Sequence, residues 1–99
     1  MSVDSTVDSG TLIIKIVGRF DFDTHLQMRE ATNKAVADIS KVIVDLSAAD
    51  YLDSSALGML LVLRDKVANN KDAIQIKGAK TEVKKILEIA NFDKLFTLT

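Results

Sequence analysis

The chain has no cysteine, one histidine and only four glycines among its 99 residues. Without cysteine it can form neither a disulfide framework nor a thiolate metal site, and it has no thiol nucleophile. The single histidine, His25, cannot anchor a conventional zinc site, and we expect it at the surface or in a helix cap rather than as a base. Because the four glycines are scattered, no phosphate-cradling loop of the nucleotide-binding type is present. These absences argue against an enzyme.

Charge and hydropathy exclude further classes. The formal net charge of −1 lacks the basic excess of a nucleic-acid-binding protein. The N-terminus shows no signal-peptide pattern, and no apolar run is long enough to span a bilayer. We therefore expect a cytoplasmic protein that does not insert into a membrane. The length and the 47% hydrophobic content suit one domain, residues 1–99, without linkers or repeats.

The charges are distributed unevenly along the chain. Residues 1–60 contain nine acidic and five basic side chains, whereas residues 61–99 contain five acidic and eight basic ones. Ordinary solvated faces account for this distribution, and a partner with a basic patch is the alternative.

The apolar pattern predicts an α/β fold in which strands and helices alternate from the middle of the chain onward. β-branched runs and turn residues predict strands at residues 1–10 (an edge strand with a turn at residues 8–10), 12–17, 42–46, 73–77 and 95–98. Helical spacing predicts three helices: one from Thr24, a second over residues 54–68, and a third from a Thr81 cap to Asn91. In the first helix, Thr24 and Gln27 form a capping box. The buried face of that helix comprises Met28, Ala31, Ala35 and Ile39. We expect a mixed sheet, largely parallel from residue 42 on, with an N-terminal antiparallel hairpin and about three covering helices.

Residues 42–63 contain the strongest candidate site. A strand at 42–46, apolar on both faces, is followed by Asp53, a preferred N-cap residue, and by Ser54 and Ser55 in the first turn of the second helix. Hydroxyls at the positive end of a helix, beyond the carboxyl end of a strand, are well placed to carry a phosphate. Ordinary helix-terminal polarity is the simpler interpretation of the serines. Asp45, at a strand end, is expected to be a hydrogen-bonding residue.

The apolar stripe of the second helix is unusually wide and has two interpretations. All of it can be core, or its first turns can offer an apolar surface to a partner.

The strand and the segment after it resemble the phosphorylation motif of bacterial STAS-domain anti-sigma factor antagonists. The residues that carry the resemblance are Asp53-Ser54-Ser55-Ala56-Leu57-Gly58. The resemblance implies a single STAS-like domain and a phosphoprotein in which Ser54 is modified, with Ser55 as the neighbouring alternative. It also implies a partner-binding rim formed by that motif together with Asp21 and Asp23.

The resemblance further implies a partner switch that regulates transcription. The unphosphorylated protein would bind an anti-sigma factor that is also an ATP-dependent serine kinase, phosphorylation of Ser54 would abolish binding, and a PP2C-type phosphatase would reverse it. No cofactor of its own is expected, because the ATP belongs to the kinase. Two positions depart from the family pattern: Ala56 stands where glycine is common, and Arg19 stands where an acid is common.

Two alternatives remain open at this point. The chain can be a stand-alone STAS subunit of a lipid transport complex that packs on an ATPase, with no modification of Ser54. It can also be a phospho-switch that acts on a target other than a sigma factor, such as a biofilm or motility regulator.

Overall fold

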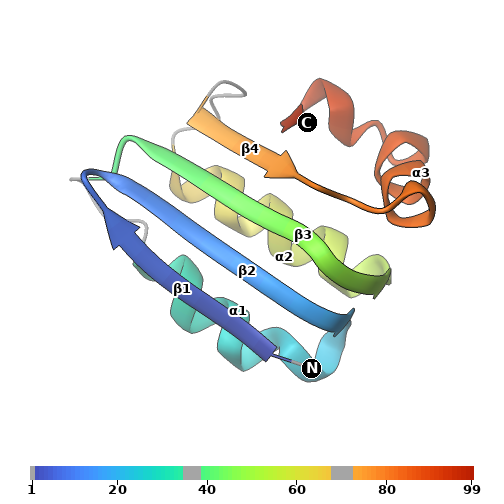
Figure 1. Cartoon of the computed structure of the whole chain (residues 1–99), viewed down its shortest axis with the longest axis horizontal. Helices are drawn as coiled ribbons and strands as arrows, with labels where there is room; N and C mark the ends of the chain where they lie inside the picture. The colour runs from blue at the N-terminus through green and yellow to red at the C-terminus, as the bar shows by residue number, and fades with distance from the viewer. Residues whose placement is uncertain (1, 35–38, 68–72) are drawn as a thin grey trace.

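The computed structural model describes residues 2–34, 39–67 and 73–99, which form a five-stranded sheet and three α-helices (Figure 1). The strands are β1 (Ser2–Asp8), β2 (Thr11–Phe20), β3 (Lys41–Leu52), β4 (Ile74–Lys77) and β5 (Thr97–Leu98). The helices are α1 (His25–Thr32), α2 (Ser54–Lys66) and α3 (Thr81–Ile89), with short 3-10 turns η1 (Phe22–Thr24) and η3 (Phe92–Lys94).

The sheet has the strand order β1-β2-β3-β4-β5 and is mixed, as expected. β1 and β2 form an antiparallel hairpin whose two turn residues, Ser9 (φ 50°) and Gly10 (φ 82°), have the positive φ that tight hairpin turns require. All other neighbouring strands pair in parallel. The parallel part therefore begins at β2, earlier than residue 42, because α1 connects β2 to β3.

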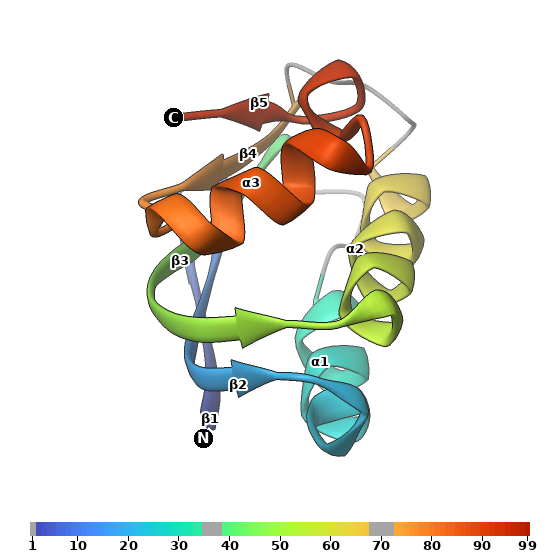
Figure 2. The same cartoon turned by 90° about the vertical axis from the view of Figure 1, so that its right-hand side faces the viewer.

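The helices are placed unequally around the sheet. α1 and α2 lie side by side on one face, and none of the described helices covers the opposite face, which is turned toward the viewer in Figure 1. α3 lies across the end of the sheet, beyond the carboxyl end of β4, where Figure 2 shows it nearest the viewer. The core fills the space between the sheet and these helices.

Side chains alternate between the two faces along each strand, and those on the helix side form this core. In β2, Leu12, Ile14 and Ile16 are fully buried, while the residues between them face the open side of the sheet. The α2 side of the core comes from Ala56, Leu60 and Leu63, each 0% exposed. Truncation of one of these leucines to alanine would cost about 2–5 kcal/mol of stability.

Two strands are longer than the sequence pattern predicts. β2, expected over residues 12–17, continues to Phe20, and β3, expected over residues 42–46, continues to Leu52. The pairing of the two strands shifts register twice, once between Lys15 and Val17 and once at Gly18. Each shift is a bulge that places an extra residue on β3 and bends the strand, so a stretch without clean alternation remains part of the sheet.

Asp45 and Gly78 accommodate the first bulge. The Asp45 Oδ1 atom accepts a hydrogen bond from the Ser47 N–H at 2.9 Å, which confirms Asp45 as a hydrogen-bonding residue. Burial raises the pKa of Asp45, but the Ser47 hydrogen bonds and the charges of Lys77 and Lys15 hold it below its usual value. Gly78, with φ of 73°, is packed so closely that a Cβ would lie 2.9 Å from the Ser47 Cβ.

The expected limits of the first two helices are only partly right. Thr24 is the N-cap residue of α1, as expected, but its buried side chain makes no cap hydrogen bond, and Asp21 caps the preceding turn η1. Ile39 lies outside α1 although it packs against the core. α2 ends at Lys66 rather than residue 68.

The third helix shows one error and one confirmed limit. Lys80, not Thr81, is the N-cap residue of α3, so the expected threonine cap is wrong. Asn91 adopts a left-handed conformation (φ 63°) after the helix ends, which confirms it as the stop. The predictions for Ala35 and Ala68 fall outside the described residues.

Candidate functional site

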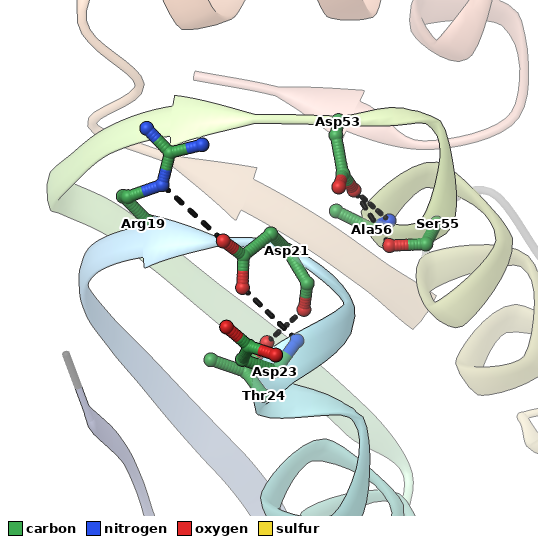
Figure 3. A network of polar contacts seen from close by, with 7 residues as sticks. All are labelled: Arg19, Asp21, Asp23, Thr24, Asp53, Ser55 and Ala56. Atoms are coloured by element: carbon green, nitrogen blue, oxygen red, sulfur yellow. Dashed lines mark hydrogen bonds and ion pairs between the residues drawn. The ribbon is translucent and has the colours of Figure 1, made fainter.

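The candidate site lies where β2 and β3 end side by side. The Asp53 N–H donates to the Phe20 carbonyl oxygen at 3.3 Å, which joins the two strand ends directly before each chain turns into its helix. Figure 3 shows the result: the β2–α1 turn with Asp21 and Asp23 lies beside the β3–α2 turn with Asp53. The structure thus brings together two segments that are about thirty residues apart in sequence.

Asp53 is the N-cap of α2, as the sequence predicts. Its Oδ1 atom accepts from the Ala56 N–H at 3.0 Å and from the Ser55 hydroxyl at 2.6 Å. The Ser55 hydrogen bond contributes most to holding the pKa of Asp53 below its usual value, and the Ala56 N–H and the charge of Arg19 act in the same direction. Asp53 is therefore a fixed negative charge at the first turn of α2.

The two candidate serines differ in environment. Ser54 is the first residue of α2 and is exposed, and no hydrogen bond of its hydroxyl is found among the described residues. Ser55 is half-buried, and its hydroxyl is engaged with Asp53. The Ser54 hydroxyl is therefore accessible without the loss of any hydrogen bond found among the described residues, whereas a change at Ser55 would break its hydrogen bond to Asp53.

The β2–α1 turn is held together by Asp21. Its carboxylate accepts from the Arg19 Nε–H at 3.2 Å and from the Asp23 N–H at 3.1 Å, and its carbonyl oxygen accepts from the Thr24 hydroxyl at 2.6 Å. The Arg19 guanidinium also lies over the Tyr51 ring, 4.3 Å from the ring centroid. Arg19, where an acid was the family expectation, thus fixes the turn next to the Ser54 rim.

The rest of the motif divides between core and surface. Ala56 is fully buried, so its side chain is not available to a partner, and Leu57 is half-buried against the core. Gly58 is exposed, and a Cβ there would meet nothing within 4 Å. Sequence reasoning missed Leu61, which is 39% exposed and lies two turns after Ser54 on the same side of α2. The i, i+4, i+7 spacing of Ser54, Gly58 and Leu61 was the signal for it.

We call the exposed stripe of Ser54, Gly58 and Leu61, with the Asp21–Asp23 turn beside its first residue, the switch surface. The wide apolar stripe of α2 is not all core: the helix is buried along one side, whereas Leu61 and Val62, beyond its first turns, are exposed.

No three His, Asp or Glu side chains converge on a possible metal position in the part of the chain that the structure describes. None of the described helices has both the length and the apolar character required to cross a membrane.

Comparison with known proteins assigns the family. Residues 2–99 match the STAS domain family, so the chain belongs to that family. The chain is 44% identical over 94 residues to the STAS-domain containing protein PA14_20770 of Pseudomonas aeruginosa (strain UCBPP-PA14). The aligned region covers 95% of this chain and 93% of that protein. It is 28% identical over 92 residues to the anti-sigma-F factor antagonist RsfB of Mycobacterium tuberculosis, covering 91% of this chain and 74% of that protein.

Solved structures agree on the fold. The unphosphorylated form of the anti-sigma factor antagonist SpoIIAA superposes with a TM-score of 0.82 at 13% identity, over 99% of this chain and 88% of that one. A sulfate transporter family protein from Wolinella succinogenes has the same fold, with a TM-score of 0.74 at 15% identity, over 90% of this chain and 73% of that one. Since the fold occurs in both, function must be argued from the site itself.

Proposed function

We propose that this protein is an anti-sigma factor antagonist that switches partners through phosphorylation of Ser54. In its unphosphorylated form it docks the switch surface on an anti-sigma factor that is also an ATP-dependent serine kinase, and thereby frees the sigma factor. The kinase then phosphorylates Ser54, the complex dissociates, and a PP2C-type phosphatase restores the hydroxyl. The protein itself carries out no chemistry.

The observation that carries this proposal is the contrast between Ser54 and Ser55. The only hydroxyl of the pair that is exposed and not engaged by Asp53 lies at the N-terminus of α2, in the middle of the switch surface. A phosphate adds about −1.5 to −2 charge, which the dipole and N–H groups of the first helical turn can stabilise, so the fold survives modification. The similarity to RsfB, which is named as an anti-sigma-F factor antagonist, supports an anti-sigma factor as the partner.

The switch needs no change of shape. In a complex the phosphate would have to lose water next to the Asp53 carboxylate, which stays ionised because its pKa is lowered. A penalty of about 3 kcal/mol would weaken binding about 150-fold, which is sufficient for a switch. Arg19 is already bound to Asp21 and packed on Tyr51, so it can bind the phosphate directly only if it leaves both contacts.

The proposal is tested by affinity purification of tagged variants from the native host. We expect the wild-type protein, Ser54→Ala and the matched control Ser55→Ala to retain an ATP-binding serine kinase, and Ser54→Asp to lose it. Retention of the kinase by Ser54→Asp at wild-type level would refute the switch. Purification of a transport ATPase instead, with equal yield for all four proteins, would favour the transport-complex alternative.

A further inference from the structure

A groove between α1 and α2 lies on a different side of α2 from the switch surface. It has a volume of about 360 Å³ and runs between the facing stripes of the two helices. Met28 forms its buried floor, Met59 is half-buried beside it, and Val62 is 56% exposed at its edge. Methionine side chains adapt to varied apolar partners, and exposed apolar surface of this kind is typical of docking sites.

Among the described residues, the side chains that line this groove and carry a full charge are both basic. Arg29 lines it from α1 and Lys66 from α2, with His25 at one end, and none of the described residues that line it is acidic. Arg29 and Lys66 are exposed and take part in neither ion pair found among the described residues, Arg19–Asp21 and Lys80–Asp50. Two cations without an ion-pair partner in the described part of the chain therefore flank an apolar floor, one on each wall, and the net charge of the chain is negative.

The length of the groove and the positions of its two cations indicate what kind of ligand fits it. The α1 wall runs from His25 to Asn33, about 12 Å at 1.5 Å per residue, or roughly two helical turns. The groove is an open trough with cations on both walls, so a single anionic headgroup would use only one of them. An amphipathic helix with acidic residues on both sides of its apolar stripe would use both.

We propose that the α1–α2 groove binds an acidic amphipathic helix of a protein partner, independently of the phosphorylation state of Ser54. The apolar stripe of the partner helix packs on Met28, Met59 and Val62, and its flanking carboxylates pair with Arg29 and Lys66. The protein would then hold one partner through this groove while it exchanges another at the switch surface.

The test is an NMR titration of the labelled protein with two short helical peptides. Both have leucines at i, i+3, i+4 and i+7 spacing, flanked by glutamates in one peptide and by lysines in the other. We expect the acidic peptide to shift amides of α1 and α2 along the groove and the basic peptide to bind at least about tenfold more weakly. The double variant Arg29→Glu/Lys66→Glu should reverse this preference.

Two single variants separate the groove from the switch surface. Val62→Glu should weaken the acidic peptide about tenfold or more, while the matched control Leu61→Glu, one residue earlier and outside the groove, should leave it unchanged. Leu61→Glu should instead impair retention of the kinase, and Val62→Glu should not. Both positions are exposed, and an unchanged amide spectrum away from the substitution shows that each variant is folded.

Several results would overturn the proposal. These are no shift with the acidic peptide up to about 1 mM, equal binding of both peptides, or shifts confined to other surfaces. Decanoate serves as a third probe, and groove shifts with decanoate but not with the acidic peptide would assign the groove to small amphiphiles. Failure of the wild-type protein to retain any kinase, with binding of the acidic peptide intact, would refute the proposed function and leave the groove proposal standing.

Discussion

Gly58 offers a test in which the stability of the fold and the binding of a partner should change in opposite directions. It lies in the second turn of α2, exposed, and a Cβ built there meets no atom within 4 Å. Glycine inside a helix is unfavourable because its backbone loses more freedom on folding than any other residue. The space around Gly58 would admit a side chain, so packing within the fold does not explain the glycine. We attribute the choice of glycine to docking, because a side chain at this position would stand between the switch surface and a partner.

The magnitude follows from helix propensity. Gly58→Ala should raise the free energy of unfolding by about 0.5–1 kcal/mol, which for a domain of this size is a rise in Tm of roughly 2–8 °C. Gly78→Ala is the matched control with the opposite sign. Gly78 has φ of 73°, and its Cβ would lie 2.9 Å from the Ser47 Cβ, so alanine there should cost at least about 1–2 kcal/mol.

The assay is urea unfolding of the three proteins followed by circular dichroism, paired with retention of the kinase from the host. We expect Gly58→Ala to unfold at higher urea concentration than wild type and to retain less kinase, because the new methyl group stands on the docking surface. A decrease in stability would refute the reasoning about the helix. A more stable protein with unchanged retention would show that Gly58 lies outside the interface.

Three further results are expected. Asp53→Ala removes the α2 cap and should cost about 1 kcal/mol by urea unfolding; recovery of most of that loss in Asp53→Asn would identify the cap as the cause, and no recovery would contradict it. The pKa of Asp53 is lowered, so its charge stabilises the fold above the usual value of 3.8; the stability difference between wild type and Asp53→Asn should shrink as the pH falls below 3.8, and a difference that grows would contradict this. Asp45→Ala removes the Ser47 hydrogen bond at the bulge and should cost about 1 kcal/mol, measured the same way, whereas an unchanged midpoint would show that the bulge does not need it.

The sequence predicts most of the fold because its elements carry strong local signals. Asp53 followed by two serines and an apolar helix identified the cap of α2, and Asn91 identified the end of α3. The extensions of β2 and β3 were missed because bulges interrupt the two-residue alternation on which strand prediction depends. Their pairing is set by hydrogen bonds between strands about thirty residues apart, which local pattern does not reveal.

The candidate site was predicted in part for the same reason. The motif residues were found in the sequence. That Ala56 is buried and Leu61 is exposed depends on the rotation of α2 about its axis relative to the sheet, which the sequence pattern does not fix. Thr24 was placed correctly at the start of α1, but the expected side-chain cap does not form, and the short 3-10 turn η1 that Asp21 caps before the helix was missed. The α1–α2 groove arises from packing between two helices about thirty residues apart, and no spacing in the sequence indicates it. The Arg19–Asp21 pair is local, but it depends on the conformation of the β2–α1 turn.

The measurement that tests the central claim most directly is the intact mass of the protein isolated from its native host under several growth conditions, with fragmentation to locate any modification. We predict one phosphoryl group, on Ser54, in a fraction of the protein that changes with growth condition. A phosphoryl group on Ser55 would contradict the assignment drawn from the Asp53–Ser55 hydrogen bond. Unmodified protein under every condition would contradict the switch itself.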